Sequence, residues 1–184
     1  MKYRILSTLL VLSSFTATAN NSADIAKKLQ NPVADMISVP VQFNYDPNIG
    51  QNEQGERWLT NVQPVVPYDL NDDLNLISRT IIPIVSQDFG SFREDGIGDI
   101  VQSFFFSPKQ QTDSGWIWGA GPVLMFPSAS EPMFGSDNWG IGPTAVLLKQ
   151  SDGWTFGALA NHIWGFGADK DQGQTDVNAT FIQP

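Results

Sequence analysis

The stretch Gly115–Phe126 (GWIWGAGPVLMF) decides the fold of this chain. Successive side chains of an extended strand point to opposite faces. The large apolar residues of this stretch therefore share one face and two glycines lie on the other: Trp116, Trp118, Leu124 and Phe126 oppose Gly119 and Gly121. One apolar face and one face of small or polar residues is typical of a half-buried soluble sheet or of a lipid-facing barrel strand.

Similar alternation recurs along the chain and predicts eight strands between turn signals. We expect them at Ala34–Tyr45, Arg57–Asp69, Leu74–Val85, Asp99–Ser107, Gly115–Phe126, Trp139–Lys149, Gly153–Trp164 and Val177–Ile182. The first seven segments are nine to thirteen residues long. That is long for a soluble strand and close to the roughly nine to eleven residues that a tilted strand needs to cross a bilayer.

The connections between these segments alternate in length. Those after the second, fourth and sixth strands are short (70–73, 108–114 and 150–152), and those after the first, third, fifth and seventh are longer (46–56, 86–98, 127–138 and 165–176). Transmembrane barrels have short periplasmic turns and longer outer loops. A soluble sandwich has no reason to keep this alternation, so the pattern favours an all-β, antiparallel, up-and-down transmembrane β-barrel.

Aromatic residues gather at both ends of the predicted strands. Those near the long loops are Tyr45, Trp58, Phe126, Trp139 and Trp164, and those near the short turns are Tyr68, Phe106, Trp116, Trp118 and Trp154. Two such rows are expected where aromatic rings sit at the two membrane–water interfaces. Strand ends of a soluble sheet also favour aromatic side chains that pack beneath loops, so a soluble all-β protein is the alternative.

Charged residues lie mostly in the predicted turns and loops. Of the 19 acidic residues only Asp35 falls clearly inside a predicted strand, and Arg79 is the lone cation in the middle of one. A charge on a lipid-facing position costs several kcal/mol at the bilayer midplane. The charge distribution therefore agrees with a barrel.

Composition excludes several classes of protein. The chain of 184 residues contains no cysteine, which excludes a disulfide scaffold, a zinc finger and a thiol enzyme. Its formal net charge of −9 argues against non-specific nucleic-acid binding.

The first residues are typical of a secretory signal peptide. Lys2 and Arg4 precede the apolar run Ile5–Phe15, and Ala17-Thr18-Ala19 follows it. The pattern predicts cleavage after Ala19, with a retained anchor as the alternative. The expected mature chain has 8 basic and 19 acidic residues, a charge of −11. We expect a signal peptide (1–19), a short N-terminal periplasmic segment (20–33) and a barrel domain (34–184).

A weak repeat accompanies the strands. Trp118-Gly119-Ala120-Gly121-Pro122 is similar to Trp139-Gly140-Ile141-Gly142-Pro143, and Gly153–Gly157 is a looser copy. Proline lacks the N–H that a sheet ladder uses. The prolines within the predicted strands are therefore interpreted as markers of β-bulges: Pro40, Pro64, Pro67, Pro83, Pro122 and Pro143.

These motifs resemble those of a bacterial outer-membrane family. Ile97-Gly98-Asp99-Ile100, Phe104-Phe105-Phe106-Ser107-Pro108, the two Trp-Gly-x-Gly-Pro motifs (the second continuing Thr144-Ala145-Val146), Gly153-Trp154-Thr155-Phe156-Gly157 and Gln183-Pro184 carry the resemblance. The family consists of transporters that are mislabelled "neuromedin U" in bacterial genomes, and it is related more distantly to the phenol meta-pathway barrels. The resemblance extends from about Asn31 to the end of the chain, and implies an outer-membrane barrel without catalytic residues.

The resemblance also implies a larger barrel than the eight predicted strands. Barrels of this family continue beyond the Gln-Pro motif and end in a strand with a terminal aromatic residue. We therefore expect the chain to be part of a barrel of about twelve strands. The alternative is a complete eight-stranded barrel whose interior is filled by side chains.

No catalytic or metal site is predicted. The single histidine, His162, would need a serine and an acid beside it for hydrolysis, but Ser151 and Asp152 are expected at the opposite end of its strand. The segment 169–176 vaguely resembles a calcium loop but lacks the Asp-Gly pair and the terminal glutamate of an EF-hand, and no helices flank it. We expect a solvated acidic loop there, no enzymatic activity and no cofactor.

We therefore expect an outer-membrane protein of a Gram-negative cell envelope. The leading hypothesis is a porin-like channel or transporter for small solutes. The alternatives are a structural or adhesive barrel with a packed lumen and a secreted soluble β-sandwich that binds a ligand. Expected partners are the outer-membrane lipids, including lipopolysaccharide, the barrel-assembly machinery and small solutes. The residues predicted to line the lumen are Gln42, Asn44, Asn61, Gln63, Asn75, Arg79, Gln102 and Asn161.

Overall fold

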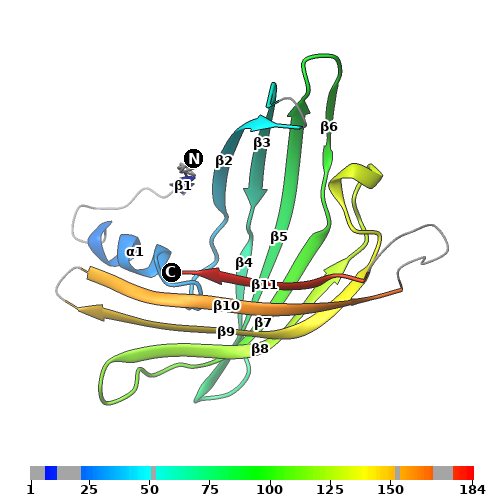
Figure 1. Ribbon diagram of the computed structural model, residues 1–184. Coiled ribbons are helices and arrows are strands. Elements are labelled where there is room, and N and C mark those ends of the chain that lie inside the picture. Colours follow the sequence, from blue (N-terminus) through cyan, green and yellow to red (C-terminus); the bar gives the residue numbers. More distant parts are fainter. Residues whose placement is uncertain (1–6, 12–21, 51–52, 152–153, 168–175) are drawn as a thin grey trace.

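One antiparallel β-sheet, curled into half of a barrel, makes up most of the protein (Figure 1). The computed structural model describes residues 7–11, 22–50, 53–151, 154–167 and 176–184. In chain order the elements are β1 (Ser7–Val11), α1 (Ser22–Leu29), β2 (Pro40–Ile49), β3 (Gly55–Val62), β4 (Val65–Asp69), β5 (Leu74–Asp88), β6 (Arg93–Ile97), β7 (Ile100–Pro108), β8 (Trp116–Phe126), the 3₁₀ turn η1 (Pro132–Phe134), β9 (Trp139–Ser151), β10 (Trp154–Phe166) and β11 (Asn178–Gln183). No helix in the described ranges is long and apolar enough to span a membrane.

The strands follow one another in the sheet in chain order. The path is β1-β2-β3-β5-β7-β8-β9-β10-β11, and every pair is antiparallel. β4 continues the line of β3 along one side of β5, and β6 precedes β7 along the other side. The prediction of an all-β, antiparallel, up-and-down sheet is confirmed.

The predicted strands are found, with differences at their ends. β2 begins at Pro40 rather than Ala34 and continues to Ile49, while β5 continues to Asp88 and pairs with β6. Parts of the long loops predicted at 46–56 and 86–98 are therefore strand, and they extend the β2–β3 and β5–β6 hairpins beyond the rest of the sheet.

Most of the prolines do not mark bulges. The register is the same on both sides of Pro64 and Pro67 along β5, and Pro122 pairs directly with Pro143 inside an unbroken β8–β9 ladder. The bulge interpretation was wrong there, because the register does not change. Pro122 and Pro143 face each other where neither N–H would take part in the β8–β9 ladder, and the pairing is interrupted instead on their other sides, opposite β7 and β10. Among the six prolines predicted to mark bulges, only Pro83 lies opposite a shift of register, where Gly98 and Asp99 stand between β6 and β7.

The two faces of the sheet differ in burial. We call the face that carries Ile77, Phe105, Val123 and Val146 the inner face, since all four side chains are buried. The opposite face, which carries Ile141, Leu147 and Phe156, is the outer face; these side chains are about half exposed. Large apolar side chains thus lie exposed on the outside of the curl.

The chain before β2 packs against the inner face. We call residues 22–38 the N-terminal segment. Its α1 helix lies close to the start of β10 (Figure 1), where the Thr155 hydroxyl donates to Oε1 of Gln30 at 2.7 Å. Val33 is buried in one cluster with Ile77, Phe105 and Val146.

The inner face of the sheet has room for this segment and forms hydrogen bonds with it. A Cβ atom at Gly119 would lie 3.1 Å from Cγ1 of Val33, so glycine leaves room for the valine. Farther along, Ser38 and Val65 exchange two backbone hydrogen bonds of 3.1 and 2.8 Å. The end of the expected periplasmic segment 20–33 therefore lies within the curl of the sheet, a placement that the sequence did not predict.

Candidate functional site

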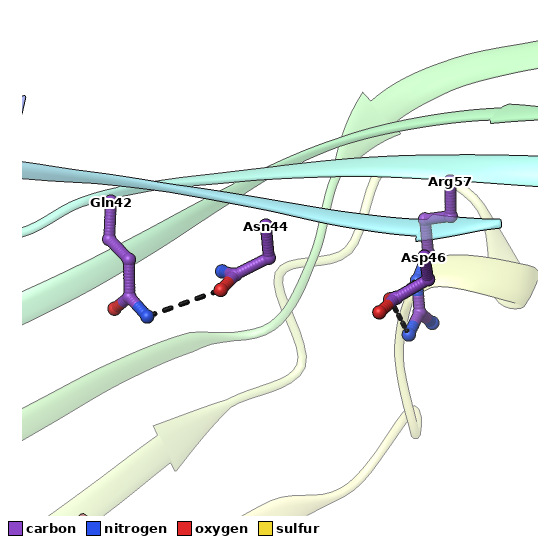
Figure 2. A network of polar contacts seen from close by, with 4 residues as sticks. All are labelled: Gln42, Asn44, Asp46 and Arg57. Carbon is purple, nitrogen blue, oxygen red and sulfur yellow. Dashed lines mark hydrogen bonds and ion pairs between the residues drawn. The ribbon is translucent and has the colours of Figure 1, made fainter. Parts of the chain in front are cut away.

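A line of polar side chains crosses the inner face over β2, the β3–β4 junction and β5. Nη2 of Arg79 donates to Oε1 of Gln63, and Nε2 of Gln63 donates to Oε1 of Gln42 at 3.1 Å. Nε2 of Gln42 then donates to Oδ1 of Asn44 at 3.2 Å (Figure 2). Four of the predicted lumen residues thus form one hydrogen-bonded line across adjacent strands, which we call the amide line (Arg79, Gln63, Gln42 and Asn44).

An ion pair lies beyond the end of the amide line. Asp46 follows Asn44 on the same side of β2, and its Oδ2 accepts from Nη2 and Nε of Arg57 at 2.6 and 3.0 Å (Figure 2). Asp46 and Arg57 are directly opposite in the β2–β3 register, which explains their contact. The sequence prediction missed this pair because both residues stand at the boundary between predicted strand and loop.

Three predicted lumen residues lie on the inner face but are not part of the amide line. Asn61 is half-buried opposite Gln42, and Asn161 is half-buried opposite Thr144 on β9. Asn75 is buried near the short-turn end, where it lines a cavity of about 550 Å³ beside the N-terminal segment. These three residues share the face of the amide line without extending its hydrogen bonds.

Gln102 differs from the prediction and lies on the outer face. It is directly opposite Thr80 in the β5–β7 register and therefore shares the face of Thr80. Its Nε2 donates to the Ser78 hydroxyl at 2.9 Å, and its Oε1 accepts from the Thr80 hydroxyl at 2.6 Å. Two neighbouring hydroxyls thus satisfy the amide on a face that is otherwise mostly apolar.

All eight predicted interface aromatics lie on the outer face. Register places them there in two groups, near the long loops (Tyr45, Trp58, Trp139 and Trp164) and near the short turns (Tyr68, Trp116, Trp118 and Trp154). Tyr45 contacts Trp58 with ring centroids 4.5 Å apart, and Trp154 is 75% exposed.

Between these two groups of aromatic residues, no described strand residue on the outer face carries a charge. Lys149, level with Trp116 near the short turns, lies at its border, with Nζ 5.9 Å from the centroid of the Trp116 ring. Glu56 lies at the opposite border, where it accepts from the Tyr45 hydroxyl at 2.8 Å. The uncharged zone therefore ends at the level of the aromatic rings.

One loop at the long-loop end is organised around Asp99. Oδ1 of Asp99 accepts from the backbone N–H groups of Ser128 and Ala129, both at 3.2 Å. Its Oδ2 accepts from the backbone N–H and the hydroxyl of Ser136 at 2.7 and 2.8 Å. One carboxylate thus holds both ends of the loop 127–138, a role that the Gly98-Asp99 motif in the sequence did not indicate.

No cluster of metal-binding side chains is present in the described part of the chain. No group of three or more His, Asp or Glu side chains gathers there. His162 lies on the outer face, with Nδ1 2.7 Å from the Thr180 hydroxyl and its ring 4.5 Å from that of Trp164. The loop considered for calcium lies almost entirely outside the described residues.

No protein-family model, curated protein or solved structure matches the chain.

Proposed function

We propose that the chain forms part of an outer-membrane β-barrel that carries small solutes through its interior. The observation that carries this proposal is the outer face: exposed apolar side chains, without charge, between two groups of aromatic rings. Lipid-facing barrel surfaces have this composition, because charge at the midplane costs several kcal/mol and aromatic rings favour the interfaces.

The inner face supports the transport part of the proposal. The amide line and the Asp46–Arg57 pair offer hydrogen-bonding groups in the interior of the curl. Water and polar solutes need such groups along a passage. The N-terminal segment narrows this passage, because Val33 packs against the opposite wall at Phe105 and Gly119.

Export requires a targeting signal, and we assign that role to residues 1–19, with cleavage after Ala19. Most of this region lies outside the described residues. β1, which belongs to it, pairs along the edge of β2. Its removal frees that edge for pairing within the mature barrel.

Two measurements on purified protein test the proposal. Closed membrane barrels migrate as a compact form on a gel until heated, so unheated samples should run faster than heated ones. Liposomes that contain the protein should then release a small polar dye faster than empty liposomes. Identical mobility before and after heating would contradict the barrel, and release no faster than from empty liposomes would contradict the channel.

A structural or adhesive barrel is the second candidate. The cluster of Val33, Ile77, Phe105 and Val146 favours it, because a filled interior stabilises a barrel without leaving a passage. This candidate predicts heat-dependent mobility together with liposomes that stay sealed.

A further inference from the structure

A second cavity lies between the N-terminal segment and the inner face, and Arg79 forms part of its wall. Its volume is about 490 Å³, within the roughly 300–1,000 Å³ of sites that bind small molecules. Gln63 and Arg79 supply polar groups on one side, while Val65, Leu148 and Leu159 supply apolar ones. The cavity therefore suits a ligand with one polar end and one apolar body.

Arg79 is a buried cation without a carboxylate partner in the described residues. The residue is 7% exposed, and the ion pairs of the described ranges leave it out. A guanidinium has five N–H donors, of which the bond to Gln63 uses one. A buried charge is costly unless an opposite charge and hydrogen bonds offset it.

The carboxylates nearest in register on the inner face are already paired. Asp46 binds Arg57 at 2.6 Å, and Asp69, at the short-turn end of β4, binds Lys109 at 2.7 Å. The acidic loops lie at the ends of the strands, and salt screens charges over about 8–10 Å. The positive charge of Arg79 therefore remains available to a ligand inside the cavity.

We propose that this cavity binds an amphipathic monocarboxylate, with the carboxylate on Arg79 and the apolar body against Val65, Leu148 and Leu159. Arginine and carboxylate pair through two parallel hydrogen bonds. An inorganic anion would leave the apolar wall unfilled, and a neutral amphipath would leave the guanidinium uncompensated. The inference rests on the proposed function, since it names the class of solute that the passage takes.

Hexanoate and hexan-1-ol are suitable probes, because they share an apolar chain and differ in charge. Calorimetric titration of the full chain in lipid nanodiscs, corrected with empty nanodiscs, should give at least about tenfold tighter binding for hexanoate. Equal affinity for the two probes would overturn the proposal.

Two arginine substitutions sharpen the test. Arg79→Gln should weaken hexanoate binding at least about tenfold and leave hexan-1-ol binding unchanged. The matched control Arg93→Gln removes an exposed guanidinium outside the cavity, and it should change hexanoate affinity by less than about twofold because Arg93 is solvated and paired with Asp95. Wild-type affinity for hexanoate in Arg79→Gln would overturn the proposal.

The design separates this inference from the channel. If Arg79→Gln does not fold, the comparison of the two probes on the wild-type protein decides alone. Hexanoate binding with sealed liposomes contradicts transport and leaves the carboxylate site standing. Open liposomes without selective hexanoate binding contradict the carboxylate site and leave the channel standing.

Discussion

Gly142 shows how a single residue fixes the spacing between β9 and β10. A Cβ atom built there would overlap the carbonyl oxygen of His162, which belongs to the backbone and cannot turn away. The position therefore accepts no larger residue without a shift of one strand.

Gly142→Ala should consequently destabilise the protein by about 1–3 kcal/mol, the usual cost of overpacking. The measurement is the temperature at which the compact gel form disappears. Ala158→Val is the matched control, because it adds volume to the exposed outer face of β10 and should leave that temperature almost unchanged. If both variants lost the compact gel form at the same temperature, β9 and β10 could move apart at little cost in stability.

Asp99 stabilises a loop rather than a strand. Asp99→Asn retains the shape of the side chain but replaces one accepting oxygen by an NH₂ group, which cannot accept from Ser128 and Ala129 or from Ser136. We expect a loss of about 2 kcal/mol, since bonds to a charged group are worth about 1.5–3 kcal/mol each.

Hydrogen exchange measures this effect locally. Amides of 127–138 should exchange faster in Asp99→Asn, whereas the exposed control Asp113→Asn should leave them unchanged. Unchanged protection of the loop in Asp99→Asn would mean that η1 and its neighbours hold the loop without the carboxylate.

At single positions, alternation in the sequence predicted most faces and failed at Gln102. Asn75 stands between Leu74 and Leu76, so its face is unambiguous. Gln102 stands next to Ser103, and two adjacent polar residues fit either face. The pairing of Gln102 with Thr80 determines the face on which Gln102 lies. Thr80 belongs to β5 and precedes Gln102 by more than twenty residues in the chain.

At the scale of elements, the central parts of the strands were predictable and their ends were not. β-Branched and aromatic alternation marks β8 and β9 along their length. The hairpin of β5 and β6 instead includes Asp88, Arg93 and Asp95, which have no strand periodicity, and it forms because the chain turns back on a strand that is already paired.

The N-terminal segment escaped prediction for a related reason. The alternation after Ala34 predicted a strand there, and neither it nor the short helix indicated a contact with β7 to β10. Only the glycine at position 119, on a distant strand, leaves room for Val33. The fit between Val33 and the inner face can be recognised only when the positions of both are known.

Val33→Asp should release this segment, because a carboxylate among Phe105, Val65 and Ile77 would be buried without a partner. Trypsin should then cleave after the exposed Lys28 at least about tenfold faster, and dye release from liposomes should rise. Ile37→Asp is the matched control, since Ile37 lies in the same segment and is 66% exposed. Unchanged cleavage in Val33→Asp would mean that other contacts hold the segment in place.

At the scale of the whole molecule, the outer face distinguishes a membrane barrel from a soluble sheet. Ala145 lies exposed in the middle of this face, directly between Ala120 and Ala160 of the neighbouring strands. In a bilayer, Ala145→Lys should cost about 2–4 kcal/mol. In water, the same substitution at an exposed site should change stability by less than about 0.5 kcal/mol.

Urea unfolding of the protein in lipid vesicles measures this difference. Ser114→Lys, in an exposed short turn, is the control and should behave like the wild type. A small effect of Ala145→Lys would contradict the membrane location of the outer face.

The architecture as a whole was predictable because it follows from repeated local signals: alternation, turn residues and strand length. The interior was not predictable to the same extent. The amide line joins residues of β2, the β3–β4 junction and β5, and its hydrogen-bond partners depend on the registers between these segments.

The hydrogen bond between Gln30 and Thr155 has a consequence for the time course of folding. The two residues are 125 positions apart in the chain, and contacts between distant positions form slowly. During synthesis the N-terminal segment emerges before β2 to β11, yet Val146 and Thr155, against which it rests, emerge more than a hundred residues later. This early part of the chain is therefore expected to be among the last to become ordered, and until β10 has formed the interior of the curl stays open to water.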